Sequence, residues 1–185
     1  MPPDQLQSHI TSTGENTVSA SVSAFQHLVE LADSTVSRHR YLREALACIA
    51  RAFGSPYATL SAHYGSEVVN EEFHSGQTSP AFWREPVRNF LADALADGQP
   101  HARLLSARQA KLQIGLLSAP FTVRDGGMTG GVVLVCPVTR TEVDVLAANL
   151  QALVALAAHL ADNLNRPGEN RRGGGTSSHA LAHAA

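Results

Sequence analysis

The sequence predicts an α+β fold: an antiparallel sheet of about five to six strands, with N- and C-terminal helices on one face and a helix and loop roofing the other. Three observations predict it. Apolar residues recur at helical spacing from about residue 17 and again up to residue 164. From Tyr57 the apolar spacing changes to every second residue, which is typical of strands. Between residues 115 and 164 a tight turn separates two apolar strands, and one long helix follows.

The composition indicates one domain with tails, in a chain of 185 residues. Hydrophobic residues make up 44% and charged residues 16%. Because roughly 25% charged is typical of soluble domains, we expect some apolar surface to meet a partner. The net charge is −2 without a basic run, which argues against nucleic acid.

Neither the N-terminus nor the cysteines indicate export. The opening residues lack the basic-then-apolar layout of a signal peptide. No stretch approaches the ~18 to 20 uninterrupted apolar residues of a membrane span, so we expect no direct membrane insertion of this segment. Cys48 falls in a helical pattern and Cys136 in a strand pattern. Two isolated thiols do not form a disulfide framework, which favours a cytoplasmic location.

The first third of the chain reads as a tail and two helices. Residues 1–16 are polar and aperiodic, and we expect a disordered arm. Residues 17–36 predict an N-terminal amphipathic helix whose apolar positions step by 4,3,4,3,4. These positions are Val18, Val22, Phe25, Val29, Ala32 and Val36. A second helix, capped by Ser34 or Ser37 and ended by Gly54, carries Leu42, Leu46, Ile49 and Phe53.

The middle of the chain predicts a hairpin and a helix. Strands from Tyr57 and from Glu67 to Phe73 flank a turn at residues 64–66. On the second strand, Glu71 and Glu72 should point to opposite faces. Ser79 and Pro80 begin a helix that ends at Gly98. Pro86 within it is expected to separate or kink the first turn.

The last part of the chain predicts three strands, a helix and a linker. The strands are His101 to Ser106, Leu112 to Val123 and Gly130 to Pro137, with a link at residues 107–111 and a turn at residues 124–127. The glycine pairs at 126–127 and 130–131 indicate turn geometry and close backbone approach. A helix then runs from Thr141 to Leu164. Residues 165–185 read as a linker and a possible start of a further element, so further domains are expected after Ala185.

The hairpin and helix of residues 115–164 resemble the last third of a GAF domain, a small sensory module found in many signalling proteins. The final strand begins with small residues, Gly130-Gly131-Val132-Val133-Leu134-Val135, as GAF sequences do. The resemblance covers about residues 38–164 and assigns the GAF-like domain to residues 37–164. The related PAS fold is the main alternative, and the long C-terminal helix with the extra N-terminal helix favours GAF.

The resemblance implies a ligand cavity between the sheet and the central loop. The small polar residues of the first strand, Ser61 and His63 among them, are expected to face it. His74 and His101 fall at strand ends beside that loop, and Trp83 heads the middle helix together with Arg84. The alternatives are surface histidines and a tryptophan that only packs the helix on the sheet. A cavity filled by Phe73, Trp83 and Phe121 would argue against a ligand.

The sequence lacks the residues on which several specialised GAF functions depend. The Asn-Lys-Phe-Asp-Glu signature of cyclic-nucleotide binders is absent, and residues 74–111 contain no cysteine for a bilin. No histidines are paired as HxH or HExxH, and no cysteine or acidic residue stands at metal-ligand spacing from one, so neither a metal nor a haem is expected. No Ser/His/Asp or paired-carboxylate constellation appears. We therefore expect a non-catalytic domain without a cofactor.

The apolar helix stripes predict a homodimer held by the terminal helices. The interface is expected at Phe25 and Val29 on the first helix and at Leu150 and Leu153 on the last. The first helix precedes the domain and is expected to lie outside its core. Two functions follow: a sensory domain that binds an unknown small molecule and dimerises, or a ligand-free dimerisation or tethering module of a larger signalling or membrane-associated protein.

Overall fold

The computed structural model describes residues 21–34, 37–76, 79–105, 113–123 and 127–164. Its centre is a five-stranded antiparallel sheet in the order β2-β1-β5-β4-β3. The strands are β1 (Tyr57–Tyr64), β2 (Glu67–His74), β3 (His101–Leu105), β4 (Gln113–Val123) and β5 (Met128–Val138). The predicted α+β architecture is therefore confirmed.

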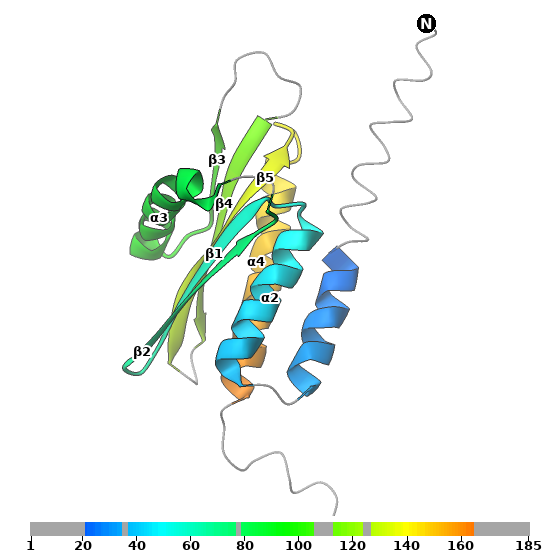
Figure 1. Ribbon diagram of the computed structural model, residues 1–185, viewed down its shortest axis with the longest axis vertical. Coiled ribbons are helices and arrows are strands. Elements are labelled where there is room, and N and C mark those ends of the chain that lie inside the picture. The colour runs from blue at the N-terminus through cyan, green and yellow to red at the C-terminus, as the bar shows by residue number, and fades with distance from the viewer. Residues whose placement is uncertain (1–20, 35–36, 77–78, 106–112, 124–126, 165–185) are drawn as a thin grey trace, which may run out of the picture.

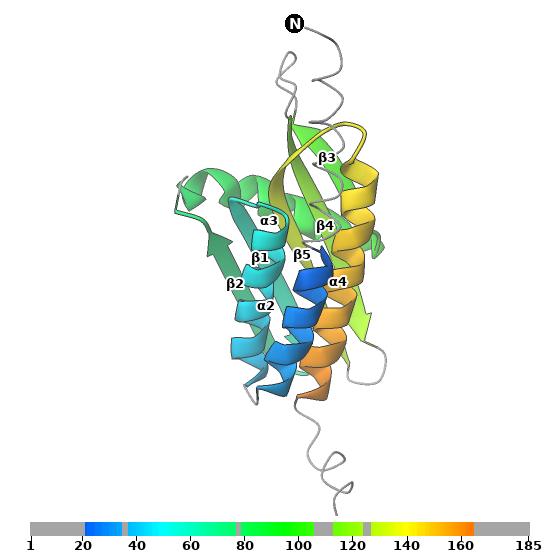
Figure 2. The ribbon, with the colours of Figure 1, turned by 90° about the vertical axis from the view of Figure 1, so that its right-hand side faces the viewer.

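Helices cover both faces of this sheet (Figure 1). One face carries α2 (Arg38–Ala52) and α4 (Val143–Asn163), and the other carries α3 (Pro80–Asp97). A further helix over residues 21–33, blue in the figures, lies against α2 and α4 on the side away from the sheet (Figure 2). The predicted arm, the linker and most of the two predicted links at 107–111 and 124–127 lie outside the described residues.

Helix ends follow the signals in the sequence. Ser37 caps α2, accepting a hydrogen bond from the Arg40 backbone N–H at 3.4 Å. Ser79 and Pro80 begin α3, and Gly98 ends it in the left-handed conformation at φ 68°. The expected separation of the first turn at Pro86 is wrong, because α3 runs without interruption through that residue. Pro86 lies on the exposed side, where water can satisfy the carbonyl that proline leaves free.

Two apolar clusters hold the layers together. The larger lies between the sheet and α2, α4 and the 21–33 helix. The smaller lies between the sheet and α3 and contains Tyr57, Trp83, Val87, Phe90, Leu91, Leu116, Val133 and Val135. Alternate residues of β1 belong to opposite layers: Ala58, Leu60 and Ala62 are in the larger cluster, while Tyr57 is in the smaller. Glu71 and Glu72 also diverge as predicted, since Glu71 pairs with Arg43 of α2 and Glu72 with Arg84 of α3.

The 21–33 helix belongs to the domain core, contrary to the prediction that it lies outside. Ala24, Leu28 and Leu31 are at most 8% exposed and join the larger cluster. The Tyr41 hydroxyl of α2 donates to the Leu28 carbonyl at 3.4 Å. Three residues of the predicted stripe instead face outward, Val22, Phe25 and Val29, at 55%, 38% and 42% exposure. Ala32 packs against the cluster, and Val18 and Val36 lie outside the described residues. The helix has two apolar stripes, and the one not singled out from the sequence packs on the domain.

On α4, the expected interface positions Leu150 and Leu153 are both 0% exposed. They pack into the cluster beneath the sheet, so a second subunit cannot reach them, and this part of the dimer prediction is wrong. Among the described helices, α4 is the one long and apolar enough to cross a membrane by length and composition alone, at 21 residues and mean hydropathy 1.6. In this fold its buried residues complete the core: Leu150, Leu153, Val154, Ala157, Ala158, Ala161 and Asp162.

Candidate functional site

A cavity of about 480 Å³ lies between α3 and the outer face of β1 and β2. Its floor is the α3-facing row of β1, Tyr57, Thr59 and Ser61, joined by Asn70 and Glu72 of β2. Its other wall is one side of α3. The residues of that wall are Ala81, Arg84, Glu85, Val87, Arg88, Leu91, Ala92 and Leu95. This size falls in the range of small-molecule sites.

The close approach of α3 to the sheet depends on Gly131 of β5, which pairs with Ser61 of β1. A Cβ at Gly131 would stand 2.9 Å from Leu91 Cδ1 and 3.3 Å from Leu95 Cδ2. Both distances are shorter than ordinary van der Waals contact. The absence of a side chain there lets the two leucines reach the sheet at the end of the cavity. The prediction of close backbone approach at residues 130–131 is thus confirmed.

An ion pair spans the cavity between β2 and α3. Arg84 Nε donates to both carboxylate oxygens of Glu72, at 3.2 and 3.1 Å, and Arg84 Nη2 donates to Oε2 at 3.0 Å. Burial, and then the neighbouring Glu72 carboxylate, raise the pKa of Tyr57, so its hydroxyl is protonated at neutral pH. The Arg84 and Glu72 side chains are partly exposed, at 60% and 40%, so their ion pair contributes little to stability. It positions α3 over the cavity floor.

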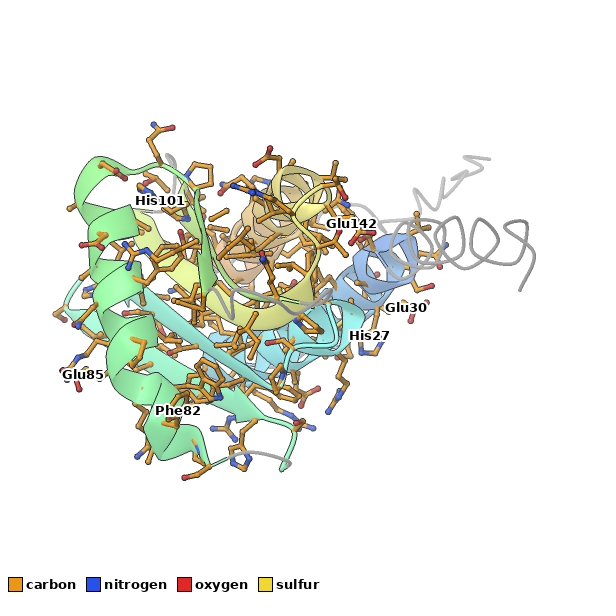
Figure 3. The ribbon with its side chains drawn as sticks, turned by 90° about the horizontal axis from the view of Figure 1, so that it is seen from above. His27, Glu30, Phe82, Glu85, His101 and Glu142 are labelled. Atoms are coloured by element: carbon orange, nitrogen blue, oxygen red, sulfur yellow. The ribbon has the colours of Figure 1, made fainter. Side chains whose placement is uncertain are left out.

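The polar groups of the lining divide into engaged and unengaged ones. Besides Glu72 and Arg84, Thr59 is engaged, since its hydroxyl donates to the Glu71 carbonyl at 3.2 Å. Within the part of the chain that the structure describes, the side chains of Asn70, Glu85 and Arg88 have no hydrogen bond or ion pair. Ser61 Oγ has only a distant neighbour, His63 Nε2 at 3.5 Å. Of these four side chains, Ser61, Asn70 and Arg88 can address a bound molecule, whereas Glu85 lies on the outer side of α3 (Figure 3).

Of the five predicted ligand residues, Ser61 lines this cavity. His63 lies on the same face of β1 and lines a neighbouring cavity of about 400 Å³ with Leu95, Pro120, Thr122 and Thr129. His74, at the end of β2, is exposed and does not line either cavity. The five residues therefore do not form one site.

The other two predicted residues have packing roles along α3. Trp83 is 6% exposed in the smaller apolar cluster, which is the packing alternative considered from the sequence. His101 Nε2 lies 2.8 Å from Asp97 Oδ2, and its ring meets that of Phe90 edge-on at 6.1 Å. The Gln99 backbone N–H, and then His101, hold the pKa of Asp97 below its usual value. Figure 3 shows His101 and Phe82, the residue before Trp83, at opposite ends of α3.

Sequence reasoning missed Asn70, Glu72, Arg88, Leu91 and Leu95. Their signal is present in the sequence as two patterns. Asn70 and Glu72 follow the period of two on β2, and Arg84, Arg88, Leu91 and Leu95 follow the spacing of one helix face. Nothing in either pattern says which helix face meets which strand. That pairing comes from the tertiary structure.

The described residues offer neither a metal cluster nor a thiol at this cavity. No group of three or more His, Cys, Asp or Glu side chains there could hold a metal ion. Both cysteines are free. Burial raises the pKa of the Cys136 thiol to about 12, and it also raises the pKa of Cys48. Neither thiol faces the cavity on the α3 side.

No family model and no curated protein matches this sequence. Solved structures with a similar fold include the GAF domain of A. aeolicus nlh2, with 11% identity over 78% of this chain and 96% of that chain and a TM-score of 0.55. The GAF domain of a putative sensor histidine kinase from Pseudomonas syringae pv. tomato matches with 19% identity, 85% and 95% coverage and a TM-score of 0.51.

A third similar structure is the N-acylhomoserine lactone dependent LuxR family transcription factor CepR2 from Burkholderia cenocepacia. It has 16% identity, covers 75% of this chain and 93% of that chain, and has a TM-score of 0.50. At these identities the likeness concerns the fold. With the five-stranded order and the helices on both faces, it shows that the chain has a GAF-like fold.

Proposed function

We propose that this chain is a non-catalytic sensory or regulatory domain that binds a small molecule in the cavity between α3 and strands β1 and β2. The observation that carries this proposal is the cavity itself, about 480 Å³ with unengaged polar side chains on both walls. A protein of similar fold, CepR2, is described as dependent on an N-acylhomoserine lactone. We place the domain in the cytoplasm, within a larger signalling protein.

The aromatic residues that would have filled the cavity lie elsewhere, which favours a ligand over a purely tethering role. Phe73 and Phe121 pack in the cluster on the opposite face of the sheet. Trp83 lies on the α3 side but in the apolar cluster beside the cavity. Small polar side chains such as Ser61 therefore line the floor.

Native mass spectrometry of the protein from its own host tests this proposal, because it reports any retained molecule directly. We expect a mass excess that disappears in Ser61→Phe, which fills the floor, and persists in Ser61→Ala, which does not. Circular dichroism of both variants checks that they are folded. Identical masses for the apoprotein and the purified protein, with no molecule released on denaturation, would argue for the tethering module instead.

We further propose that the domain forms a homodimer through the exposed stripe of the 21–33 helix. Val22, Phe25 and Val29 are spaced by 3 and 4 residues, and α2 and α4 do not cover them. In heptad terms Val22 and Val29 take a positions and Phe25 a d position, the positions along which two helices of a coiled coil pack. The partner that we propose is a second copy of the same helix, packed along this stripe.

Phe25→Asp with Val29→Asp is expected to give a folded monomer in sedimentation velocity, since both side chains lie outside the buried cluster. The matched control is Ser23→Asp with His27→Asp, which adds the same two carboxylates on a flank of this helix that is also exposed. The control should remain dimeric. A dimer that survives the first pair of substitutions would show that this stripe is not the interface.

A further inference from the structure

We infer that the α3 cavity takes a small amphipathic anion, such as a carboxylate with a short apolar chain, and that Arg88 is its principal anchor. This inference rests on the proposed ligand-binding function and specifies the class of ligand. It begins from the charges that the cavity leaves unpaired. Arg84 and Glu72 neutralise one another in a bidentate pair, so neither is available to a ligand without breaking that pair.

One cation and one carboxylate of the lining then remain, Arg88 and Glu85. Their positions on α3 differ. The buried face of α3 consists of Trp83, Val87, Phe90, Leu91 and Ala94. At 3.6 residues per turn, Glu85 lies about 180° from the centre of that face, while Arg88 lies about 120° from it. Glu85 thus points toward water, and Arg88 lies on the flank that overhangs β1 and β2.

The surroundings of Arg88 suit an anion with an apolar body. Arg88 lies one turn from Leu91 and two turns from Leu95, and these two leucines form the apolar end of the cavity. Opposite, the Ser61 hydroxyl and the Asn70 amide offer further donors. A guanidinium binds a carboxylate through two parallel N–H···O bonds, whereas a neutral or cationic head group would leave it unpaired. The apolar end takes the chain, and the guanidinium with Asn70 takes the head.

The negative charge of Glu85 repels the same anion. Substitutions at Arg88 and Glu85 should therefore change the affinity in opposite directions. Removing the positive charge at Arg88 should weaken anion binding, and removing the negative charge at Glu85 should strengthen it. If Arg88 and Glu85 merely supported the fold, both substitutions would weaken binding. The charge-matched control is Arg140→Gln, between β5 and α4, which does not line the cavity.

The experiment uses the full chain and three six-carbon probes that differ only in the head group: hexanoate, hexanamide and hexylamine. Isothermal titration calorimetry gives the affinities, and the fluorescence of Trp83, the one tryptophan of the sequence, gives a second signal from the layer beside the cavity. We expect hexanoate to bind at least about tenfold more tightly than the other two. Arg88→Gln should remove most of that difference, Glu85→Gln should increase hexanoate affinity, and Arg140→Gln should change nothing.

Equal binding of the three probes, or hexanoate binding that Arg88→Gln leaves unchanged, would overturn the ligand class while the small-molecule site itself stands. No binding of any probe would also overturn it. The native mass measurement then separates the two proposals. A retained molecule would mean that the domain binds a ligand of another class, and no retained molecule would mean that the sensory function fails as well.

Discussion

At the scale of single residues, the two adjacent glycines of β5 have different neighbours although the sequence presents them as one pair. Gly131 faces α3, and a Cβ there would meet the tips of Leu91 and Leu95. Gly130 faces the other way. A Cβ there would stand 2.1 Å from the Ser61 backbone oxygen and 2.7 Å from Phe121 Cζ. Backbone cannot rotate away as a leucine methyl can, so the two positions differ in tolerance.

We therefore expect Gly130→Ala to destabilise the domain by about 1 to 3 kcal/mol or more, since the β1–β5 pairing itself must shift. Gly131→Ala should cost less than about 1 kcal/mol, because Leu91 can change rotamer and alanine reduces the entropy of the unfolded chain. Urea unfolding of both variants measures the difference. Equal losses at the two positions would contradict the assignment of their opposite faces.

At the scale of elements, the 21–33 helix, α2 and α4 pack together in one apolar cluster. The helix of residues 21–33 buries Ala24, Leu28 and Leu31 against the domain and leaves a second stripe outside. The last turn of α4 is held from α2, where Arg38 Nε donates to the Ala161 carbonyl at 3.1 Å and the guanidinium stacks 4.1 Å from the Tyr64 ring. Arg38 thus connects the C-terminal end of α4 to α2 and to β1.

Leu28→Ala should lower the free energy of unfolding by about 2 to 5 kcal/mol, as expected for a fully buried leucine. Val29→Ala, one residue along the same helix and 42% exposed, is the matched control and should change it by about 0.5 kcal/mol or less. Denaturant unfolding at a concentration where the protein is monomeric provides the measurement. If Leu28→Ala were as mild as the control, the helix would not be part of the folding unit.

At the scale of the whole molecule, the two cysteines lie in parts of the structure that would become exposed in different steps of unfolding. Cys136 lies in β5 within the sheet core, is 1% exposed, and has a pKa raised by burial to about 12. Cys48 lies at the contact of α2 with the 21–33 helix, where its Sγ is 4.0 Å from the Ala24 carbonyl. It is half-buried, and burial raises its pKa as well. Detachment of the 21–33 helix alone would expose Cys48 and leave Cys136 covered.

Labelling with a thiol reagent at pH 8 should therefore proceed in two steps. Burial keeps Cys136 in the unreactive thiol form and covers it, so this residue should react only through global unfolding. Cys48 should react first, at a rate that reflects local opening of the helix. Mass spectrometry of the labelled peptides distinguishes the two sites. The labelling is repeated over a series of denaturant concentrations. If Cys48 and Cys136 were labelled together at every concentration, the 21–33 helix and the sheet would open as one unit.

Local patterns in the sequence determined the elements and their order. The period of two on β1, the Ser37 cap of α2, Pro80 at the start of α3 and the Gly98 end of α3 are each explained by chemistry within a few residues. The same holds for the opposite directions of Glu71 and Glu72. The last strand is expected from Gly130 but begins two residues earlier, at Met128. These signals sufficed for the α+β class and for the GAF resemblance, which implied that Ser61 faces a cavity.

Only the tertiary structure decided which apolar stripe of each helix is buried and which polar residues share a cavity. The 21–33 helix carries two stripes of similar spacing, and helical periodicity cannot rank them, because burial depends on the surface that α2 and α4 present. Leu150 and Leu153 likewise cover the sheet of their own chain. Arg88 meets Ser61 and Asn70 through the packing angle of α3 across the sheet, a long-range contact that no local pattern contains.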